Sequence, residues 1–231
     1  MSNTLIKTVL FDLDGTLADT ATDLADALNQ VLRNNQRKEL PFETIRPWVS
    51  HGGQVMIRNG FQIAPDDPWF ESLRREFLDY YQSNIARKTD LFPGMHEVLD
   101  GIEQRGFNWG VVTNKPSWLT VPLMQALQLQ QRSTCIISGD TLSQCKPHPA
   151  PLLHACELAG SHANQCLYIG DAERDIIAGQ RANMKTLVAL FGYLGENDVP
   201  ADWSADALIA QPAEILSWLD QHNRQVISRN E

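Results

Sequence analysis

FDLDGTLADT, residues 11–20, places two carboxylates directly after a short apolar run. Residues 9–11 are typical of a buried strand, and Asp12 and Asp14 follow them with one leucine between. A carboxylate at the end of a buried strand is costly unless a cation or a hydrogen-bond donor pairs with it. This stretch therefore predicts a first strand that ends in a site for a cation or for a reaction.

The composition is that of an ordinary globular protein. The chain has 231 residues, of which 43% are hydrophobic and 20% charged, and its formal net charge is −9. This is enough chain for a sizeable core, and we expect one large domain with or without a smaller insert. Lysine and arginine form no prominent run, so we expect neither a nucleic-acid nor a membrane partner.

Nothing in the sequence suggests export. The first residues have no basic region before a long apolar stretch, so we expect no signal peptide, and no apolar run approaches the roughly 18 residues of a membrane span. The cysteines have no zinc-like spacing, which favours reduced thiols. They are Cys135, Cys145, Cys156 and Cys166. We expect a cytoplasmic protein, and the sequence leaves open whether it is a monomer or a homodimer.

Short apolar runs alternate with stretches of helical periodicity along much of the chain. The expected strands are residues 8–11, 109–113, 135–137, 167–169, 186–190 and 207–209. The helices expected between and after them are residues 95–106, 117–129, 150–160 and 173–184. Buried strands that alternate with helices predict a parallel sheet covered on both faces, and right-handed crossovers make it doubly wound. The expected fold class is therefore α/β with a doubly wound parallel sheet.

The segment 20–86 interrupts this alternation. It contains only helical patterns, and it is too long for a single crossover between the first two expected strands. The simplest arrangement is an all-helical cap domain that is inserted after the first strand. We therefore predict a core of residues 1–18 and 88–231 and a cap of residues 19–87.

Polar residues follow the first four strands of the expected core, and ligands bind at this edge in doubly wound sheets. In chain order they are Asp12 and Asp14, then Thr113, Asn114 and Lys115, then Lys146, and finally Asp171 and Asp175. Taken alone, each group has an ordinary structural explanation, such as a solvated turn or a helix N-cap. Together they predict carboxylates, a hydroxyl and an ammonium in one crevice.

This set suits phosphoryl transfer through a covalent aspartyl phosphate. Such a reaction needs an in-line nucleophile, groups that neutralise the phosphoryl oxygens and a proton for the leaving oxygen. Asp12, at the strand tip, is the expected nucleophile, and Asp14 is the expected general acid and then general base. Thr113 can donate to a phosphoryl oxygen, and Lys146 supplies a fixed positive charge.

The same carboxylates predict a magnesium site. Asp12 and Asp171 offer the oxygen ligands that Mg²⁺ prefers in proteins. A cation there also relieves the repulsion between closely spaced carboxylates. Asp175 either orients Lys146 or supports the metal through a bound water, and the sequence leaves both possibilities open.

Four segments resemble the motifs of the haloacid dehalogenase superfamily, in the order in which that family has them. They are FDLDGTLADT, VVTNK, the lysine of CKPHPAP and GDAERD. The resemblance covers nearly the whole chain and implies a Rossmann-like core with a helical cap. It also implies that Mg²⁺ is held by Asp12, the backbone carbonyl of Asp14 and Asp171, with Asp175 in support.

The resemblance narrows the reaction as well. Dehalogenases of the superfamily lack a carboxylate at the position of Asp14, because halide leaves without a proton. Asp14 therefore implies a phosphate ester as the substrate, and a phosphatase or a phosphomutase as the enzyme. A non-catalytic binding module is disfavoured, because Asp12 and Asp14 are both present.

Further segments resemble the superfamily's phosphatases of carbohydrate metabolism. They are LFPGM, WGVVTNKP, KPHPAPLLHAC and FGYLGENDVPADWSAD. We expect a Mg²⁺-dependent phosphate monoester hydrolase that acts on a small phosphorylated metabolite, with 2-phosphoglycolate or a similar phosphorylated carboxylate as the substrate. The alternatives are a phosphatase of N-acetylmuramic acid 6-phosphate in cell-wall recycling and a sugar phosphomutase of the same fold.

The cap segment RPWVSHGGQVMIRNG is where we expect the rest of the substrate to be recognised. A cap over the crevice excludes water and contacts whatever lies beyond the phosphate. Gly52 and Gly53 precede a helical pattern and can present backbone N–H groups to an anion. Arg46 and His51 can pair with a substrate carboxylate. In the core, Asn114 completes the expected substrate-binding residues.

Overall fold

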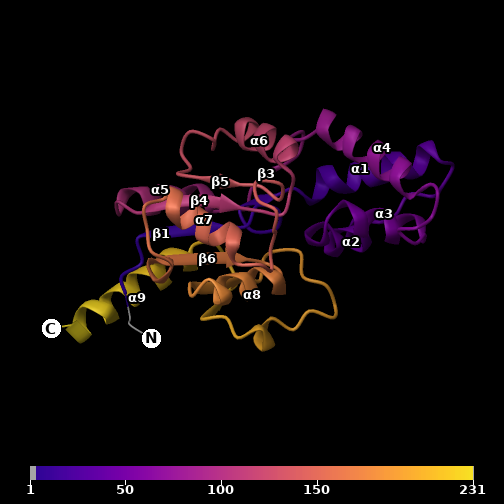
Figure 1. The fold of residues 1–231 in the computed structure, drawn as a ribbon. Helices are drawn as coiled ribbons and strands as arrows, with labels where there is room; N and C mark the ends of the chain where they lie inside the picture. Colours follow the sequence, from indigo (N-terminus) through magenta and orange to yellow (C-terminus); the bar gives the residue numbers. More distant parts are fainter. Residues whose placement is uncertain (1–3, 231) are drawn as a thin grey trace.

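Six parallel strands form the centre of the molecule, and the computed structural model describes residues 4–230 (Figure 1). The strands are β1 (Thr8–Phe11), β4 (Asn108–Val112), β5 (Ile136–Ile137), β6 (Cys166–Gly170), β7 (Lys185–Ala189) and β8 (Ala207–Ile209). Their order is β5-β4-β1-β6-β7-β8, and each neighbouring pair is parallel. The predicted α/β fold is confirmed, and no predicted strand end lies more than one residue from the observed end.

Helices cover both faces of this sheet. They are α5 (Met95–Gln104), α6 (Ser117–Ala126), α7 (Ala150–Leu158), α8 (Glu173–Arg181) and α9 (Glu214–Asn230), with short 3-10 helices η2 (Ala163–Gln165) and η3 (Pro200–Trp203) in the connections. Val9 and Phe11 of β1 lie in the apolar cluster that contains residues of α5, α6 and α9, whereas Leu10 lies in the cluster with α7 and α8. All three side chains are fully buried, as a strand covered on both faces requires.

The order in which strands are added to the sheet switches sides at β1. The chain first adds β4 and β5 on one side of β1, and then β6, β7 and β8 on the other side. In open α/β sheets such a switch leaves a crevice at the carboxyl ends of the central strands, where ligands bind. The residues that follow β1, β4 and β6 therefore meet at one edge.

A helical insert (residues 21–83) lies on the side of the sheet away from the two termini (Figure 1). It consists of α1 (Ala21–Asn34), α2 (Phe42–Ile45), the 3-10 helix η1 (Arg46–His51), α3 (Gly53–Phe61) and α4 (Phe70–Ser83). Leu28 of α1 and Phe77 of α4 are fully buried in it, and a Cβ atom at Gly60 of α3 would lie 2.9 Å from Cδ1 of Leu28. The predicted helices are present, while the division of the chain into two domains stays a prediction.

Two short antiparallel strands, β2 (Ala18–Asp19) and β3 (Asp90–Leu91), join the insert to the sheet. The sequence does not predict them, because two residues are too few to show a periodic pattern. The carboxylate of Asp23 in α1 accepts hydrogen bonds from the backbone N–H groups of Lys88 and Thr89 at 3.0 and 2.9 Å. The two connections of the insert are therefore held side by side.

The chain beyond His222 is polar, and its composition predicts a frayed end. This prediction is wrong for residues 223–230. Helix α9 continues to Asn230. The Asn223 amide accepts a hydrogen bond from the backbone N–H of Ile6 at 2.8 Å and donates to its carbonyl at 3.1 Å. Val226 is buried one turn further on. Contact with the start of the chain thus stabilises a segment whose own composition does not.

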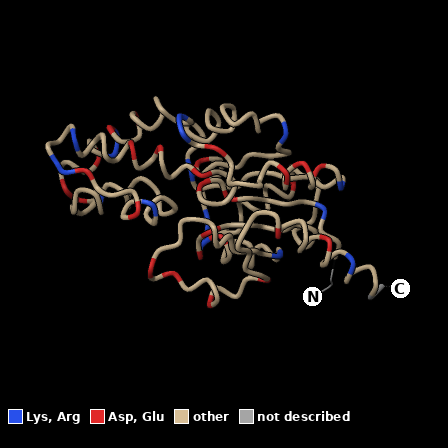
Figure 2. Tube along the Cα trace, turned by 180° about the vertical axis from the view of Figure 1, so that it is seen from behind, with Lys and Arg blue, Asp and Glu red and all other residues tan. Residues whose placement is uncertain are grey.

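Within residues 4–230, every helix is too short or too polar to cross a membrane. Lys and Arg residues are spread over both the insert and the sheet region (Figure 2). The expected lack of a nucleic-acid partner stays a prediction.

Candidate active site

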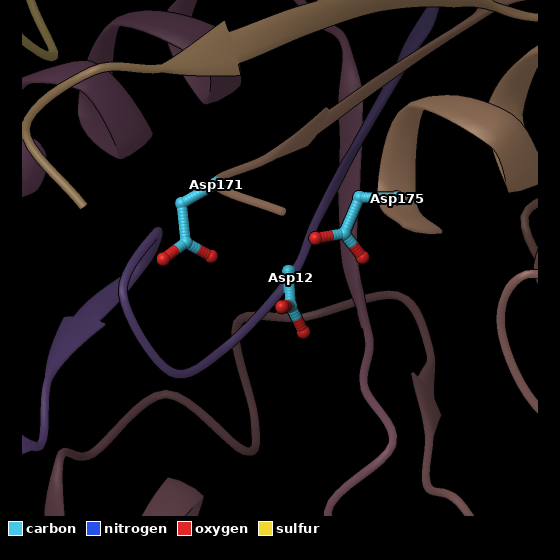
Figure 3. Close-up of side chains that lie close together, drawn as sticks. All are labelled: Asp12, Asp171 and Asp175. Carbon is cyan, nitrogen blue, oxygen red and sulfur yellow. The ribbon is translucent and has the colours of Figure 1, made fainter. Parts of the chain in front are cut away.

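The residues predicted at the strand ends converge at one edge of the sheet. Asp12 follows β1, Thr113 follows β4 and Asp171 follows β6, and all three are buried. Figure 3 shows the carboxylates of Asp12, Asp171 and Asp175 close together, the last from the first turn of α8. One oxygen of each lies within 4.8 Å of the others. Buried carboxylates this close need positive charge among them.

Lys146 supplies positive charge inside this group. Its Nζ lies 2.8 Å from Oδ1 of Asp12 and 2.7 Å from Oδ1 of Asp175. It also donates a hydrogen bond to the Tyr168 hydroxyl at 2.7 Å, and that hydroxyl donates to the Val112 carbonyl at 2.9 Å. The sequence does not single out Tyr168, because a tyrosine inside the β6 run looks like any other core residue.

Asn114 holds the loop that carries Lys146. Its side-chain amide donates to the Lys146 carbonyl at 2.9 Å and accepts from the Lys146 N–H at 3.0 Å. The Thr113 hydroxyl accepts a hydrogen bond from the N–H of Lys115 at 3.1 Å, and Thr113 lines a cavity between the insert and the sheet edge. Both predicted residues line that cavity, but both ends of the Asn114 amide are engaged by backbone groups.

The turn after Asp12 depends on a glycine. Gly15 has a φ of +84°, and a Cβ atom there would lie 2.2 Å from Oδ2 of Asp171. Only glycine adopts that backbone conformation without strain and leaves that space. The N–H of Leu13 donates to Oδ1 of Asp12 at 2.8 Å. Gly15 therefore lets the turn after β1 pass close to the Asp171 carboxylate, and the Leu13 N–H fixes the Asp12 carboxylate.

Burial and mutual repulsion make the ionised carboxylates costly. Burial raises the pKa of Asp12, although the charge of Lys146 opposes that shift. The pKa of Asp171 is raised to about 7, first by burial and then by the charges of Asp12 and Asp175. Clustered carboxylate oxygens with incomplete charge compensation suit a hard divalent cation. The residues present could therefore hold a metal ion at Asp12 and Asp171.

Asp175 is engaged in other contacts. Its Oδ1 pairs with Lys146, and its Oδ2 accepts the N–H of Ala172 at 3.1 Å at the start of α8. Of the two possibilities that the sequence leaves open, these contacts favour the one in which Asp175 orients Lys146. The Asp14 side chain lies outside the described carboxylate cluster, so only its backbone carbonyl is left for the metal role implied by the resemblance.

Ser50 brings the helical insert into contact with this site. Its hydroxyl donates to Oδ2 of Asp171 at 2.6 Å, and the N–H of Tyr193 donates to the same oxygen at 2.8 Å. The backbone carbonyl of Ser50 accepts a hydrogen bond from the guanidinium of Arg174. Burial alone would lower the pKa of Arg174, but the charges of Asp175 and Asp12 raise it. Ser50 and Arg174 are not among the predicted site residues, although they lie within the segments RPWVSHGGQVMIRNG and GDAERD.

Asp14 faces a different set of partners. Its Oδ1 lies 2.8 Å from Nζ of Lys115 and accepts a hydrogen bond from the Thr20 hydroxyl at 2.6 Å. The Lys115 ammonium also lies over the ring of Tyr81, a residue of α4, at 4.6 Å from the centroid. Burial opposes the charged form of Lys115, but Asp14 and Tyr81 together more than offset this and raise its pKa. Lys115 thus links the predicted acid/base to the insert.

A cavity of about 420 Å³ lies between the insert and the sheet edge. The predicted site residues that line it are Asp12, Asp14, Thr113 and Asn114 from the sheet region, and His51, Gly52 and Gly53 from the insert. Burial and the charge of Arg174 lower the pKa of His51, which favours the neutral imidazole. The Gly52 N–H donates to the Val49 carbonyl at 2.9 Å, so of the two predicted glycine donors it is the one already engaged.

Arg46 lies apart from the residues that line this cavity. Its guanidinium donates to the Phe191 carbonyl at 3.1 Å and lies 4.9 Å from the centroid of the Tyr193 ring. These contacts attach η1 to the loop after β7. A role for Arg46 in binding a carboxylate would require both contacts to be given up.

Comparison with known proteins gives one family. Residues 9–189 match the family described as haloacid dehalogenase-like hydrolase. A phosphoglycolate phosphatase of Xanthomonas campestris is 41% identical over 209 residues, with 90% of this chain and 94% of the relative covered. An N-acetylmuramic acid 6-phosphate phosphatase of Pseudomonas aeruginosa is 40% identical over 222 residues, with 96% and 98% covered.

The structure is similar to solved structures as well. The crystal structure of a protein described as a predicted phosphoglycolate phosphatase, from Haemophilus somnus, superimposes with a TM-score of 0.84 at 28% sequence identity. The match covers 93% of this chain and 98% of the other. The fold is therefore one that many solved structures share.

Proposed function

The chain belongs to the haloacid dehalogenase-like hydrolases, and on that premise we propose that it is a Mg²⁺-dependent phosphatase that works through a phosphorylated Asp12. One observation carries the proposal. The Asp12 carboxylate lies at the tip of β1, 2.8 Å from the ammonium of Lys146 and within the cluster formed with Asp171 and Asp175. Phosphoryl transfer requires this combination of a fixed nucleophile and positive charge at the phosphoryl oxygens.

The reaction has two steps. An oxygen of Asp12 attacks phosphorus, the bond from phosphorus to the ester oxygen breaks, and Asp14 gives its proton to the departing alkoxide. Asp14 then takes a proton from water as the water oxygen attacks the same phosphorus, which releases inorganic phosphate and restores the Asp12 carboxylate. Lys146 and the Thr113 hydroxyl stabilise the charge on the phosphoryl oxygens in both steps.

Mg²⁺ would be held by Asp12, Asp171 and the backbone carbonyl of Asp14. When bound, it neutralises charge on the phosphoryl group. Asp175 supports the site through Lys146, which it contacts at 2.7 Å. The buried Asp171 carboxylate lies in one cluster with Asp12 and Asp175, and a cation there would favour its ionised form.

The substrate is a small phosphorylated carboxylate. The names of the two relatives suggest 2-phosphoglycolate or N-acetylmuramic acid 6-phosphate, and their identities of 41% and 40% do not separate these possibilities. Both compounds carry a phosphate ester and a carboxylate, so the chemistry at Asp12 is the same for either. The choice depends on groups that lie beyond the phosphate.

Phosphate release with and without Mg²⁺ tests the proposal. The substrates are 2-phosphoglycolate, N-acetylmuramic acid 6-phosphate and glucose 6-phosphate, and the control protein is the Asp12→Asn variant. We expect release that requires Mg²⁺ and is lost in the variant. Turnover that depends on an added sugar bisphosphate, with little net phosphate release, would instead indicate a phosphomutase. Equal release by the variant would rule out Asp12 as the nucleophile.

A further inference from the structure

One face of helix α4 forms a wall of the cavity. Arg74, Phe77, Leu78 and Tyr81 all line it, and their spacing of three and four residues places them on a single helix face. Tyr81 marks the end of this face near the reacting groups, because its ring lies 4.6 Å from the Lys115 ammonium, which is 2.8 Å from Asp14. Arg74 lies at the other end.

The length of this face separates Arg74 from the reacting groups. Seven residues of an α-helix correspond to a rise of about 10 Å, so Arg74 lies two turns from Tyr81. Helical side chains also tilt toward the helix N-terminus, which for Arg74 is the direction away from Tyr81. A ligand that contacts both Asp12 and Arg74 must therefore extend well beyond its phosphate.

The Arg74 guanidinium is available to a ligand. Its ion pair within the described residues is with Glu71 on the same helix, at 3.3 Å, and the Glu71 side chain is 68% exposed. Exposed pairs of this kind contribute little free energy. A guanidinium that lines a cavity and is only weakly paired suits a carboxylate, which it can bind with two hydrogen bonds.

Trp118 contributes an aromatic surface from the sheet side of the cavity. It lies in the first turn of α6, lines the same cavity as Arg74 and is 40% exposed. Ligand cavities are lined mainly by apolar and aromatic side chains, with a few polar groups that fix the orientation of the ligand. An indole ring at this place suits the apolar face of a sugar ring.

The two candidate substrates differ in reach. In 2-phosphoglycolate three bonds separate phosphorus from the carboxyl carbon, which is at most about 5 Å at roughly 1.5 Å per bond. A carboxylate on so short a chain cannot extend far from a phosphate held at Asp12. A sugar ring between the phosphate and the carboxylate roughly doubles that reach. The cavity of about 420 Å³ also lies in the range of about 300–1,000 Å³ that larger small-molecule ligands occupy.

We propose that Arg74 and Trp118 form a second recognition site, which selects a phosphorylated sugar acid that carries its carboxylate and its phosphate on different positions of the ring. Arg74 binds the carboxylate, and Trp118 packs against the ring. The inference rests on the proposed phosphatase function and specifies its substrate class.

The test compares three substrates that differ in one group at a time. N-acetylmuramic acid 6-phosphate has the ring and the carboxylate, N-acetylglucosamine 6-phosphate has the ring alone, and 2-phosphoglycolate has the carboxylate alone. For the unmodified protein we expect the highest kcat/KM with the first. In Arg74→Gln the ratio of kcat/KM for N-acetylmuramic acid 6-phosphate to kcat/KM for N-acetylglucosamine 6-phosphate falls by about tenfold or more. The loss of a charged hydrogen-bond donor predicts this change. In Trp118→Ala the preference for ring substrates over 2-phosphoglycolate falls.

Two control variants match the tested ones. Arg75→Gln changes the exposed neighbour of Arg74, and Trp69→Ala changes a tryptophan that is 71% exposed at the start of α4. Both should keep the substrate preferences of the unmodified protein. A preference for 2-phosphoglycolate, or ratios that Arg74→Gln leaves unchanged, would overturn the second recognition site while leaving the phosphatase in place. Hydrolysis of none of the three substrates would contradict the proposed function itself.

Discussion

The ammonium of Lys115 lies 2.8 Å from the Asp14 carboxylate and 4.6 Å from the centre of the Tyr81 ring. One side chain thus contacts both the proposed acid/base and the helical insert. The Thr20 hydroxyl bonds to the same carboxylate oxygen at 2.6 Å, so two donors from different connections fix its position. Proton transfer depends on such positioning. Because Lys115 contacts both Asp14 and the insert, the position of Asp14 depends on how the insert lies over the sheet edge.

Replacement of Lys115 by glutamine should reduce kcat about tenfold for an alkyl phosphate, because Asp14 loses the partner that holds it toward the leaving oxygen. The loss should be much smaller with p-nitrophenyl phosphate, whose leaving group departs without a proton. Steady-state kinetics with both substrates measures the difference. Lys88→Gln, which removes an exposed ion pair with Asp26, should change neither value. Equal losses with both substrates would show that Lys115 acts elsewhere than on Asp14.

Replacement of Asp14 by asparagine should separate the two chemical steps. With p-nitrophenyl phosphate the first step no longer needs an acid, whereas attack by water still needs a base, which contributes roughly 10²–10⁴-fold. We expect a burst of about one equivalent of p-nitrophenol, followed by slow turnover. Stopped-flow absorbance measures it, with Asp26→Asn as the control. A linear time course at the rate of the unmodified protein would show that Asp14 is not the base in the second step.

Replacement of Tyr168 by phenylalanine should lower the free energy of unfolding by about 1–2 kcal/mol, because the Lys146 ammonium and the Val112 carbonyl each lose a buried hydrogen bond. Urea unfolding measures this change. Phosphate release should fall as well, since Lys146 then keeps only its contacts with Asp12 and Asp175. Tyr80→Phe serves as the control from the partly exposed surface of α4. Unchanged stability in Tyr168→Phe would mean that the hydroxyl contributes no net free energy there.

The pKa of Asp171, raised from 3.8 to about 7, predicts how pH and Mg²⁺ affect stability. The folded protein binds this proton more tightly than the unfolded chain, so the stabilisation is fully present below about pH 4 and is lost as pH rises through 7. Mg²⁺ requires the ionised carboxylate and should therefore raise the Tm more at pH 8 than at pH 6.

Thermal melts with and without Mg²⁺ at the two pH values measure this dependence. The Asp171→Asn variant should show a much smaller effect of Mg²⁺ at pH 8. A larger Mg²⁺ effect at pH 6 than at pH 8 in the unmodified protein would contradict the assignment of Asp171 as a ligand.

The fold could be predicted from the sequence because its strands are short, mostly apolar runs, of which β1 and β6 are buried throughout. Val9, Leu10 and Phe11 all have zero exposure although they face two different clusters, so the run itself carries the signal. The placement of Asp12, Thr113 and Asp171 followed from the same pattern, since parallel strands end at one edge. The strands β2 and β3 have only two residues each, and no periodicity marks them.

The rule that parallel strands end at one edge does not apply to the helical insert. The sequence therefore predicts the site residues of the insert less well than those of the sheet. Arg46 and Arg74 are both arginines in helices of the insert, and composition does not distinguish them. The structure places Arg46 against the Phe191 carbonyl, whereas Arg74 lines the cavity. The packing of α4 over the sheet edge decides which arginine a ligand can reach, and that packing is a tertiary property.

The most direct test of the account is to find where the phosphoryl group goes during turnover. The protein is mixed with substrate and Mg²⁺, quenched in acid within the first turnovers, digested and examined by mass spectrometry. We expect one phosphoryl group on the peptide that contains Asp12, and none in the Asp12→Asn variant. A phosphoryl group on another residue, or phosphate release by the variant at the rate of the unmodified protein, would contradict the mechanism.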